Sequence, residues 1–174
     1  PMLYPNVIAK VGEDYNKAFV LVETNDIGGQ VVEILHEEIE YDNIFSTVTE
    51  KARQYVSPGF GKSTRLGVNT SKQVKRQGCF NFKSLMEEKK LLVFDADIIS
   101  EISTFVEKGN TYQADEGYND DCVMCMVLFG WLSTMPFFKE LVDVNTREGL
   151  YKQEMQSITQ NLTPFVMRKS DEGP

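Results

Sequence analysis

Apolar residues near the N-terminus follow first a helical and then a strand-like pattern. Between residues 5 and 16 they recur every three or four positions, which predicts an amphipathic helix. The run 18–24 is short, continuous and rich in β-forming residues, apolar up to Val22, as in a buried strand of a parallel or mixed sheet. Asn25 and Asp26 are capping residues, and a second helical pattern follows them and ends near Glu38. The order helix, buried strand, helix indicates an α/β fold.

The middle of the chain has weaker patterns. Short apolar runs predict strands within residues 41–48 and at 90–94, with a loop over 57–62 between them. Asn81 is expected to cap a short helix that reaches residue 88, and Asp97 to cap another that reaches Phe105. These elements extend the alternation of helices and strands.

The last third of the chain contains the most apolar segment. Residues 106–117 are polar and carry a Gly-Asn pair, which predicts a hairpin. An acidic start at 119–121 opens an apolar helix from 122 to about 134, which Pro136 is expected to end. A further helix is predicted at 148–158 in a polar tail. We therefore expect one folded domain over residues 1–143 and a polar C-terminal helix and tail over residues 144–174.

Composition restricts the classes of partner. The net charge is -8, from 26 acidic and 18 basic residues, which argues against loose binding to nucleic acid but permits an acidic site neutralised by metal ions. No apolar run reaches the ~18 residues of a membrane span, so no membrane partner is expected. Three cysteines, an odd number, do not predict a disulfide framework, which favours a reducing cytosol.

Two acidic positions are candidates for chemistry. Glu23 ends the predicted buried strand, at the sheet edge where α/β proteins tend to bind ligands; the alternative is that the chain surfaces there. Asp120 and Asp121 open the most apolar helix, where one acid is explained by the helix dipole. Two adjacent acids point about 100° apart on a helix, so one of them is free to face a cleft. Such carboxylates suit Mg²⁺, and a pair of ions can clamp a phosphodiester.

A basic stretch stands out against the acidic background. Lys72, Lys75 and Arg76 fit either a solvated loop or edge strand, or contacts to a phosphate backbone. The Cys122–Cys125 pair has CxxC spacing, but it lies in an apolar helix, so we interpret the cysteines as small core residues. The lone His36 is interpreted as a solvated surface residue.

Several of these segments resemble a known family. The segment 116–124 running into 129–134 is most similar to the C-terminal nuclease domain of the large terminase subunit of tailed bacteriophages. Weaker similarity is found at 22–25 with Gly28, at 72–79 and at 105–109. The resemblance covers most of the chain.

This resemblance implies an RNase H-like fold, with a mixed central sheet flanked by helices, and a nuclease that cuts concatemeric viral DNA with Mg²⁺ or Mn²⁺. Among the family's clustered acids, Glu23 matches the one at the end of a later strand and Asp121 the one at the start of a C-terminal helix, with Asp120 as its neighbour. Lys72, Lys75 and Arg76 would help to seat the DNA backbone. The implied partners are double-stranded DNA, an ATPase motor domain and the capsid portal, in the cytoplasm of the infected bacterial host.

One departure from the family leads to further expectations. The family's first acid belongs to a strand upstream of the helix that starts at Pro5, and the chain begins too late to contain it. We therefore expect a truncated domain with weak or no nuclease activity and with an exposed sheet edge through which a homodimer could form. Two alternatives stay open: a non-catalytic RNase H-like module that docks to a packaging motor or portal, and another RNase H-like nuclease such as a junction resolvase or ribonuclease.

Overall fold

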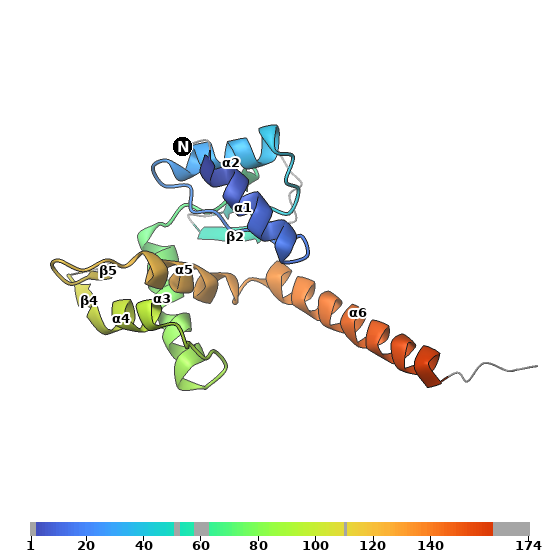
Figure 1. Ribbon diagram of the computed structural model, residues 1–174. Helices are drawn as coiled ribbons and strands as arrows, with labels where there is room; N and C mark the ends of the chain where they lie inside the picture. The colour runs from blue at the N-terminus through green and yellow to red at the C-terminus, as the bar shows by residue number, and fades with distance from the viewer. Residues whose placement is uncertain (1–2, 51–52, 58–62, 110, 162–174) are drawn as a thin grey trace, which may run out of the picture. The chain divides into compact units, whose positions relative to one another are not determined.

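The computed structural model describes residues 3–50, 53–57, 63–109 and 111–161, and contains both helices and small sheets (Figure 1). Contacts between residues divide the chain into two units, residues 1–139 and 140–174. Among the described residues, no single helix is long and apolar enough to cross a membrane.

The predicted N-terminal helices are confirmed, but the N-cap residue of the second helix is Ile27, so the interpretation of Asn25 and Asp26 as its capping residues is wrong. Helix α1 spans Leu3–Asp14, α2 spans Gly28–Glu33, and a π-helical turn, η1, continues it over Ile34–Glu38. Their inner faces share one apolar cluster with the segment that follows η1, and the buried members are Ala9, Val32, Leu35, Tyr41 and Ile44. His36 lies on the exposed side of η1, as predicted.

The predicted strand at 18–24 is an extended segment that makes isolated bridges. Val20 bridges Ile44 and Glu23 bridges Val68, both in parallel orientation. Residues 20–24 are half-buried, less than the sequence led us to expect. The two bridges reach different segments, so no continuous ladder forms; Gly67, next to Val68, has a left-handed φ of 73°.

Three short strands form an antiparallel sheet in the order β2-β1-β3. Strand β1 (Ser46–Glu50) overlaps the predicted 41–48 strand, and pairs with β2 (Arg53–Ser57) and β3 (Arg65–Leu66). The chain therefore has mixed helix and sheet, and the described strands form small antiparallel sheets. Of the predicted 57–62 loop, the structure describes only Ser57, which ends β2. Residues 58–62 lie outside the described residues.

Helix α3, Lys72–Glu87, corrects two predictions. Ser71 is its N-cap, and the Ser71 Oγ accepts a hydrogen bond of 3.2 Å from Val74 N. Asn81 therefore lies inside a helix and caps nothing, and the basic stretch is helical, so its interpretation as a loop or edge strand was wrong. The local pattern misled us because a Ser cap and a polar first turn look like a loop without the apolar partner that α3 packs against.

The segment after α3 corrects two more predictions. Residues 90–94 form no strand, because their backbone finds no ladder partner among the described residues. Helix α4 spans Ala96–Thr104, and its cap is Asp95, whose carboxylate accepts from two backbone N–H groups, instead of Asp97. The hairpin prediction is confirmed by β4 (Phe105–Lys108) paired with β5 (Thr111–Ala114).

Helix α5, Asp121–Leu132, crosses α3 at very short range (Figure 1). A Cβ atom on Gly78 would lie 2.3 Å from the Val127 carbonyl oxygen, and one on Gly130 would lie 2.7 Å from the Gly78 carbonyl oxygen. The glycines therefore allow the two backbones to touch. Val123, Val127 and Phe82 form the buried core beside this crossing.

Helix α6 spans Pro136–Asn161, so Pro136 begins a helix where we expected it only to end one. Proline is well tolerated in a first turn, because the N–H that it lacks would have no partner there. The predicted helix at 148–158 is confirmed and is longer than expected.

Phe45 connects the two apolar regions of the first unit. It is buried, and its ring centroid lies 5.1 Å from that of Phe19 and 6.2 Å from that of Phe138. Phe138 in turn packs edge-on against Phe129 of α5, at 6.2 Å. This aromatic chain ties the extended segment near Phe19 to α5.

Candidate active site

Glu23 is positioned by the bridges at the end of the extended segment. Val68 N donates to Val22 O and Thr24 N donates to Val68 O, each at 2.8 Å, so the backbone is fixed on both sides of Glu23. Gly28 approaches from α2, where a Cβ atom would lie only 1.7 Å from the Glu23 carbonyl oxygen. The half-buried Glu23 side chain therefore extends from a backbone that is held by close contacts on two sides.

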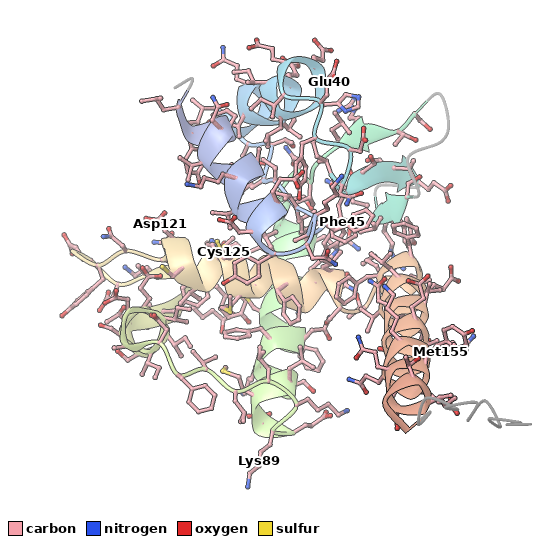
Figure 2. The ribbon with its side chains drawn as sticks, turned by 45° about the vertical axis from the view of Figure 1, so that its right-hand side comes forward. Glu40, Phe45, Lys89, Asp121, Cys125 and Met155 are labelled. Carbon is pink, nitrogen blue, oxygen red and sulfur yellow. The ribbon has the colours of Figure 1, made fainter. Side chains whose placement is uncertain are left out.

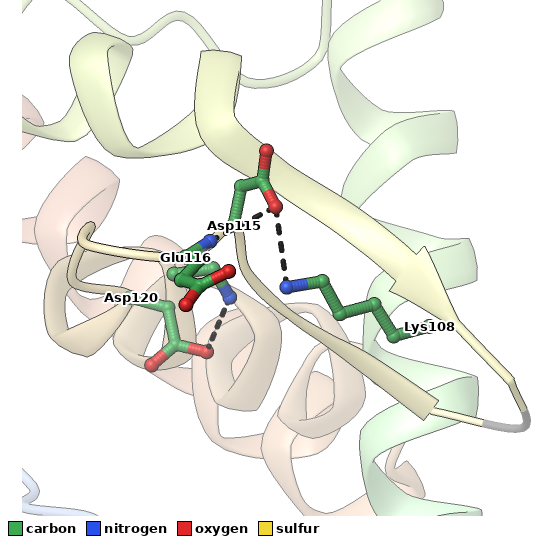
Figure 3. A network of polar contacts seen from close by, with 5 residues as sticks. Lys108, Asp115, Glu116 and Asp120 are labelled. Atoms are coloured by element: carbon green, nitrogen blue, oxygen red, sulfur yellow. Dashed lines mark hydrogen bonds and ion pairs between the residues drawn. The ribbon is translucent and has the colours of Figure 1, made fainter.

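Asp120 and Asp121 lie at the start of α5, as predicted, but they differ. Asp120 is the N-cap residue, but its side chain makes no capping hydrogen bond. Instead Asp120 Oδ2 accepts from Ala114 N at 3.2 Å, which ties the end of β5 to the start of α5 (Figure 3). Asp121 is the first helical residue and is exposed.

The hairpin beside Asp120 carries a separate polar contact. Asp115 Oδ1 accepts from Glu116 N at 2.9 Å and lies 3.2 Å from Lys108 Nζ (Figure 3). The Glu116 N–H and, after it, the Lys108 ammonium lower the pKa of Asp115. These contacts hold the turn that leads into α5.

Glu101 has a role that the sequence did not reveal. It lies near the end of α4, and its Oε2 accepts from Val123 N at 2.9 Å. The N-terminus of α5 is thus capped by a carboxylate from another helix. No local signal could have shown this, since the two residues are 22 positions apart.

One cavity of about 770 Å³ brings the predicted acids together. Glu23, Asp120 and Asp121 line it, and Lys75 of α3 lines it as well. Its apolar wall comes from α1, the extended segment, α2 and α5, including Tyr4, Ile8, Leu21, Val31, Met124 and Leu128. Residues that are almost a hundred positions apart in sequence therefore face one space.

Cys125 reports on the same convergence. It lies one helical turn after Asp121 on α5 (Figure 2). It also lines the cavity. Burial raises the pKa of its thiol, and the negative charges of Glu23, Asp121 and Glu101 raise it further, in that order. The residue as a whole is exposed and lies at the wall of the cavity. Three carboxylates from three elements thus act on one atom.

The donor set suits a hard divalent cation only in part. Carboxylate oxygens are the ligands that Mg²⁺ and Mn²⁺ favour. In the part of the chain that the structure describes, however, no three His, Cys, Asp or Glu side chains are grouped closely enough to hold a metal ion. Glu23 and Asp121 line one cavity without a third such side chain close to them among the described residues.

The basic residues of α3 separate into two groups. Lys72 and Arg76, one turn apart, are exposed. Lys75 is half-buried, and its Nζ lies 5.8 Å from the centroid of the Phe105 ring, a cation–π distance. Lys75 therefore belongs to the cavity wall, whereas Lys72 and Arg76 present positive charge to solvent.

The thiols of Cys79 and Cys122 also have raised pKa values. Burial raises the pKa of Cys79 to about 11, and burial followed by the Glu101 charge raises that of Cys122. Both cysteines are half-buried, in keeping with a packing role, but the interpretation as core is wrong for Cys125, which is exposed. Neutral thiols at pH 7 are poor nucleophiles and poor metal ligands.

Comparison with known families gives one finding. Residues 1–129 match a family model described as the terminase RNaseH-like domain. The match includes the extended segment with Glu23, all of α3, and the first three-quarters of α5 with Asp121. Helix α6 lies beyond it.

Proposed function

The chain belongs to the terminase RNaseH-like domain family, and from this premise we propose that it is a metal-dependent DNA endonuclease domain of a phage large terminase subunit. Its role would be to cut concatemeric viral DNA during genome packaging. Family membership supports a nuclease-type role in terminase; the substrate, the metal and the reaction are our proposal.

The observation that carries the proposal is the shared cavity of Glu23 and Asp121. Two carboxylates from distant elements that line one space repel each other. A bound cation offsets that repulsion. Mg²⁺ or Mn²⁺, when bound, would activate water and stabilise charge on the phosphodiester. Glu23 and Asp121 would hold the ion, and Asp120, engaged with Ala114 N, would contribute less.

We propose further that the nuclease activity of this chain is weak. Two carboxylates leave most of the coordination shell of a divalent ion to water, so the ion binds loosely. The lack of a third close ligand among the described residues supports this. It also favours the second candidate function, a non-catalytic RNase H-like module that docks to the packaging motor or portal.

DNA would be seated by the exposed face of α3. Lys72 and Arg76 are one turn apart and solvent-exposed, which suits contacts to successive phosphates without base readout. Lys75, on the cavity wall with Glu23 and Asp121, would then meet the phosphate nearest the metal. Double-stranded DNA, an ATPase motor domain and the capsid portal are the proposed partners, in the cytoplasm of the infected bacterial host.

A second copy is a further proposed partner, through the edge of the extended segment. Leu21 lies between the bridge residues, and its backbone makes no hydrogen bond to the rest of the described chain. Beside it, α1 exposes large apolar side chains, with Tyr4 at 63% and Val7 at 55%. An unpaired edge flanked by apolar surface invites strand pairing.

The test is Mn²⁺ binding measured by electron paramagnetic resonance, together with plasmid cleavage. Glu23→Gln and Asp121→Asn should each weaken Mn²⁺ binding at least tenfold and abolish any cleavage. Glu33→Gln, which removes an exposed charge on α2, is the matched control and should leave both unchanged. Equal Mn²⁺ binding by all three variants would contradict the nuclease proposal. If Mn²⁺ binding depends on Glu23 and Asp121 but the chain cleaves no plasmid, the docking module becomes the favoured function.

A further inference from the structure

The exposed part of α6 carries a regular apolar stripe. Positions 141, 144, 148, 151, 155 and 158 alternate in spacing between three and four residues, and five of the six are apolar: Leu141, Val144, Tyr151, Met155 and Ile158. Glu148 is the exception. An alternation of three and four is the seven-residue repeat of helices that pack along a shared seam. We call these six positions the α6 seam.

The seam side chains are largely exposed. Val144 is 50% exposed, Tyr151 65%, Met155 44% and Ile158 49%, and Met155 is labelled in Figure 2. Large apolar groups in a continuous stripe mark a contact surface more often than an ordinary surface. A helix of this kind gains most of its stability by packing that stripe against another helix.

From this pattern we propose that α6 pairs with α6 of a second copy of this chain, with the two helices antiparallel. The charged residues beside the α6 seam favour one orientation of the two helices. In a parallel pair Arg147 would lie beside Lys152 of the second copy, and the two cations would repel each other. In an antiparallel pair with the middle of the seam at the centre, Arg147 lies near Glu154 of the second copy. Twofold symmetry gives that attractive contact twice.

The antiparallel arrangement also accounts for Glu148. When the seam positions are paired about their midpoint, Glu148 lies opposite Tyr151 of the second copy. A tyrosine hydroxyl can donate to a carboxylate, so the polar residue finds a partner inside the contact. A single polar residue in a seam fixes register and lowers stability. Arg147 and Glu154 form no ion pair within the described part of the chain, which leaves them available.

The pairing is expected to be weak and concentration-dependent. The described side chains span fewer than three heptads, and Gly149 lowers helix propensity by about 1 kcal/mol relative to alanine. Association then couples to stabilisation of the helix itself. This contact differs from the sheet edge at Leu21 and does not depend on the nuclease proposal.

The experiment is sedimentation velocity of the full 174-residue chain over a range from 1 to 500 μM, on the order of the span needed for a weak dimer. Met155→Glu places a charge in the seam and should abolish association. Gln153→Glu adds the same charge on the opposite side of α6 and is the matched control, with no effect expected. Glu148→Leu replaces the polar seam residue and should tighten the dimer at least tenfold. Circular dichroism of each variant checks that α6 remains helical.

A charge-reversal cycle tests the orientation. Arg147→Glu and Glu154→Arg should each weaken the dimer, and the double variant should restore it. A parallel pair predicts the reverse for Arg147→Glu, because the new carboxylate would then meet Lys152. A monomer at every concentration, including for Glu148→Leu, would overturn the proposal. A dimer that Met155→Glu leaves intact would also overturn the proposal, because it would point to the sheet edge as the contact. The seam would then pack within one chain or against another partner.

Discussion

The two sides of the candidate site are held in very different ways. Asp121 begins α5, whose backbone touches α3 at Gly78 and Gly130 and whose Val127 is completely buried. Glu23 ends an extended segment with two isolated bridges and half-buried side chains. One carboxylate therefore belongs to a tightly packed helix pair and the other to a weakly paired segment. In such a site, the metal geometry would depend mainly on how far the Glu23 side can move.

The largest expected effect lies at the helix crossing. Gly78→Ala would place a Cβ atom 2.3 Å from the Val127 carbonyl oxygen, a backbone atom that cannot move without separating the helices. We expect a loss of about 3 kcal/mol in the free energy of unfolding, measured by urea denaturation, since overpacking outweighs the gain in helix propensity. Gly29→Ala, with its nearest contact at 3.9 Å, is the control and should be neutral or slightly stabilising. If both variants unfold alike, the crossing is looser than the structure indicates.

A smaller loss of stability is expected on the Glu23 side, although the contact there is shorter. Gly28→Ala would place a Cβ atom 1.7 Å from the Glu23 carbonyl oxygen. Because the extended segment is held by two isolated bridges and not by a packed helix pair, we expect it to shift, at a loss of about 1–2 kcal/mol. The shift should move Glu23 and weaken Mn²⁺ binding more than Gly78→Ala does at equal folded fraction. The reverse ranking of the two variants in Mn²⁺ binding would contradict the comparison.

The contrast also explains which parts of the fold could be predicted. Helix α1, the hairpin and the start of α5 were predicted correctly, because periodicity, a Gly-Asn turn and acids before an apolar run are local signals. Residues 90–94 have the composition of a strand but no ladder partner, and pairing is a property of the whole fold. The start of α3 was missed because its helical face is defined by α5, some fifty positions later.

The candidate site divides in the same way. Glu23 and Asp121 could be proposed from their places at the end of an apolar run and at the start of an apolar helix, and the family resemblance supported both. Glu101 could not, because its role depends on α4 bringing it to the N–H of Val123. Lys75 was grouped with Lys72 and Arg76 by sequence, whereas its ammonium group faces Phe105. The sequence shows which residues are charged, whereas the packing of the folded chain determines which groups each charge contacts.

A moderate loss of stability is expected when Glu101, which caps the N-terminus of α5, is replaced. Glu101→Ala removes the acceptor for Val123 N, and the loss of a cap should cost about 1 kcal/mol in urea denaturation. Glu101→Gln keeps an acceptor oxygen and should recover most of that stability. If the two variants are equally destabilised, the charge of Glu101 at the N-terminus of α5 matters more than its hydrogen bond.

The smallest expected effect is a change in the pKa of Cys125. It is the most direct measure of whether Glu23 and Asp121 face the same cavity. Glu23, Asp121 and Glu101 all raise the pKa of Cys125, so removing each charge should lower that pKa and increase the thiolate fraction at pH 8. The rate of Cys125 alkylation, followed by peptide mass spectrometry to separate it from Cys79 and Cys122, should rise in each variant. The rise should be largest for Glu23→Gln and smaller for Asp121→Asn and Glu101→Gln, the order in which the charges act, while Glu33→Gln should leave the rate unchanged. A faster alkylation rate with Asp121→Asn but an unchanged rate with Glu23→Gln would mean that the extended segment lies away from α5 in solution.

The cavity would then have one acidic side, and the proposed metal site would be lost while the α3–α5 packing stayed intact.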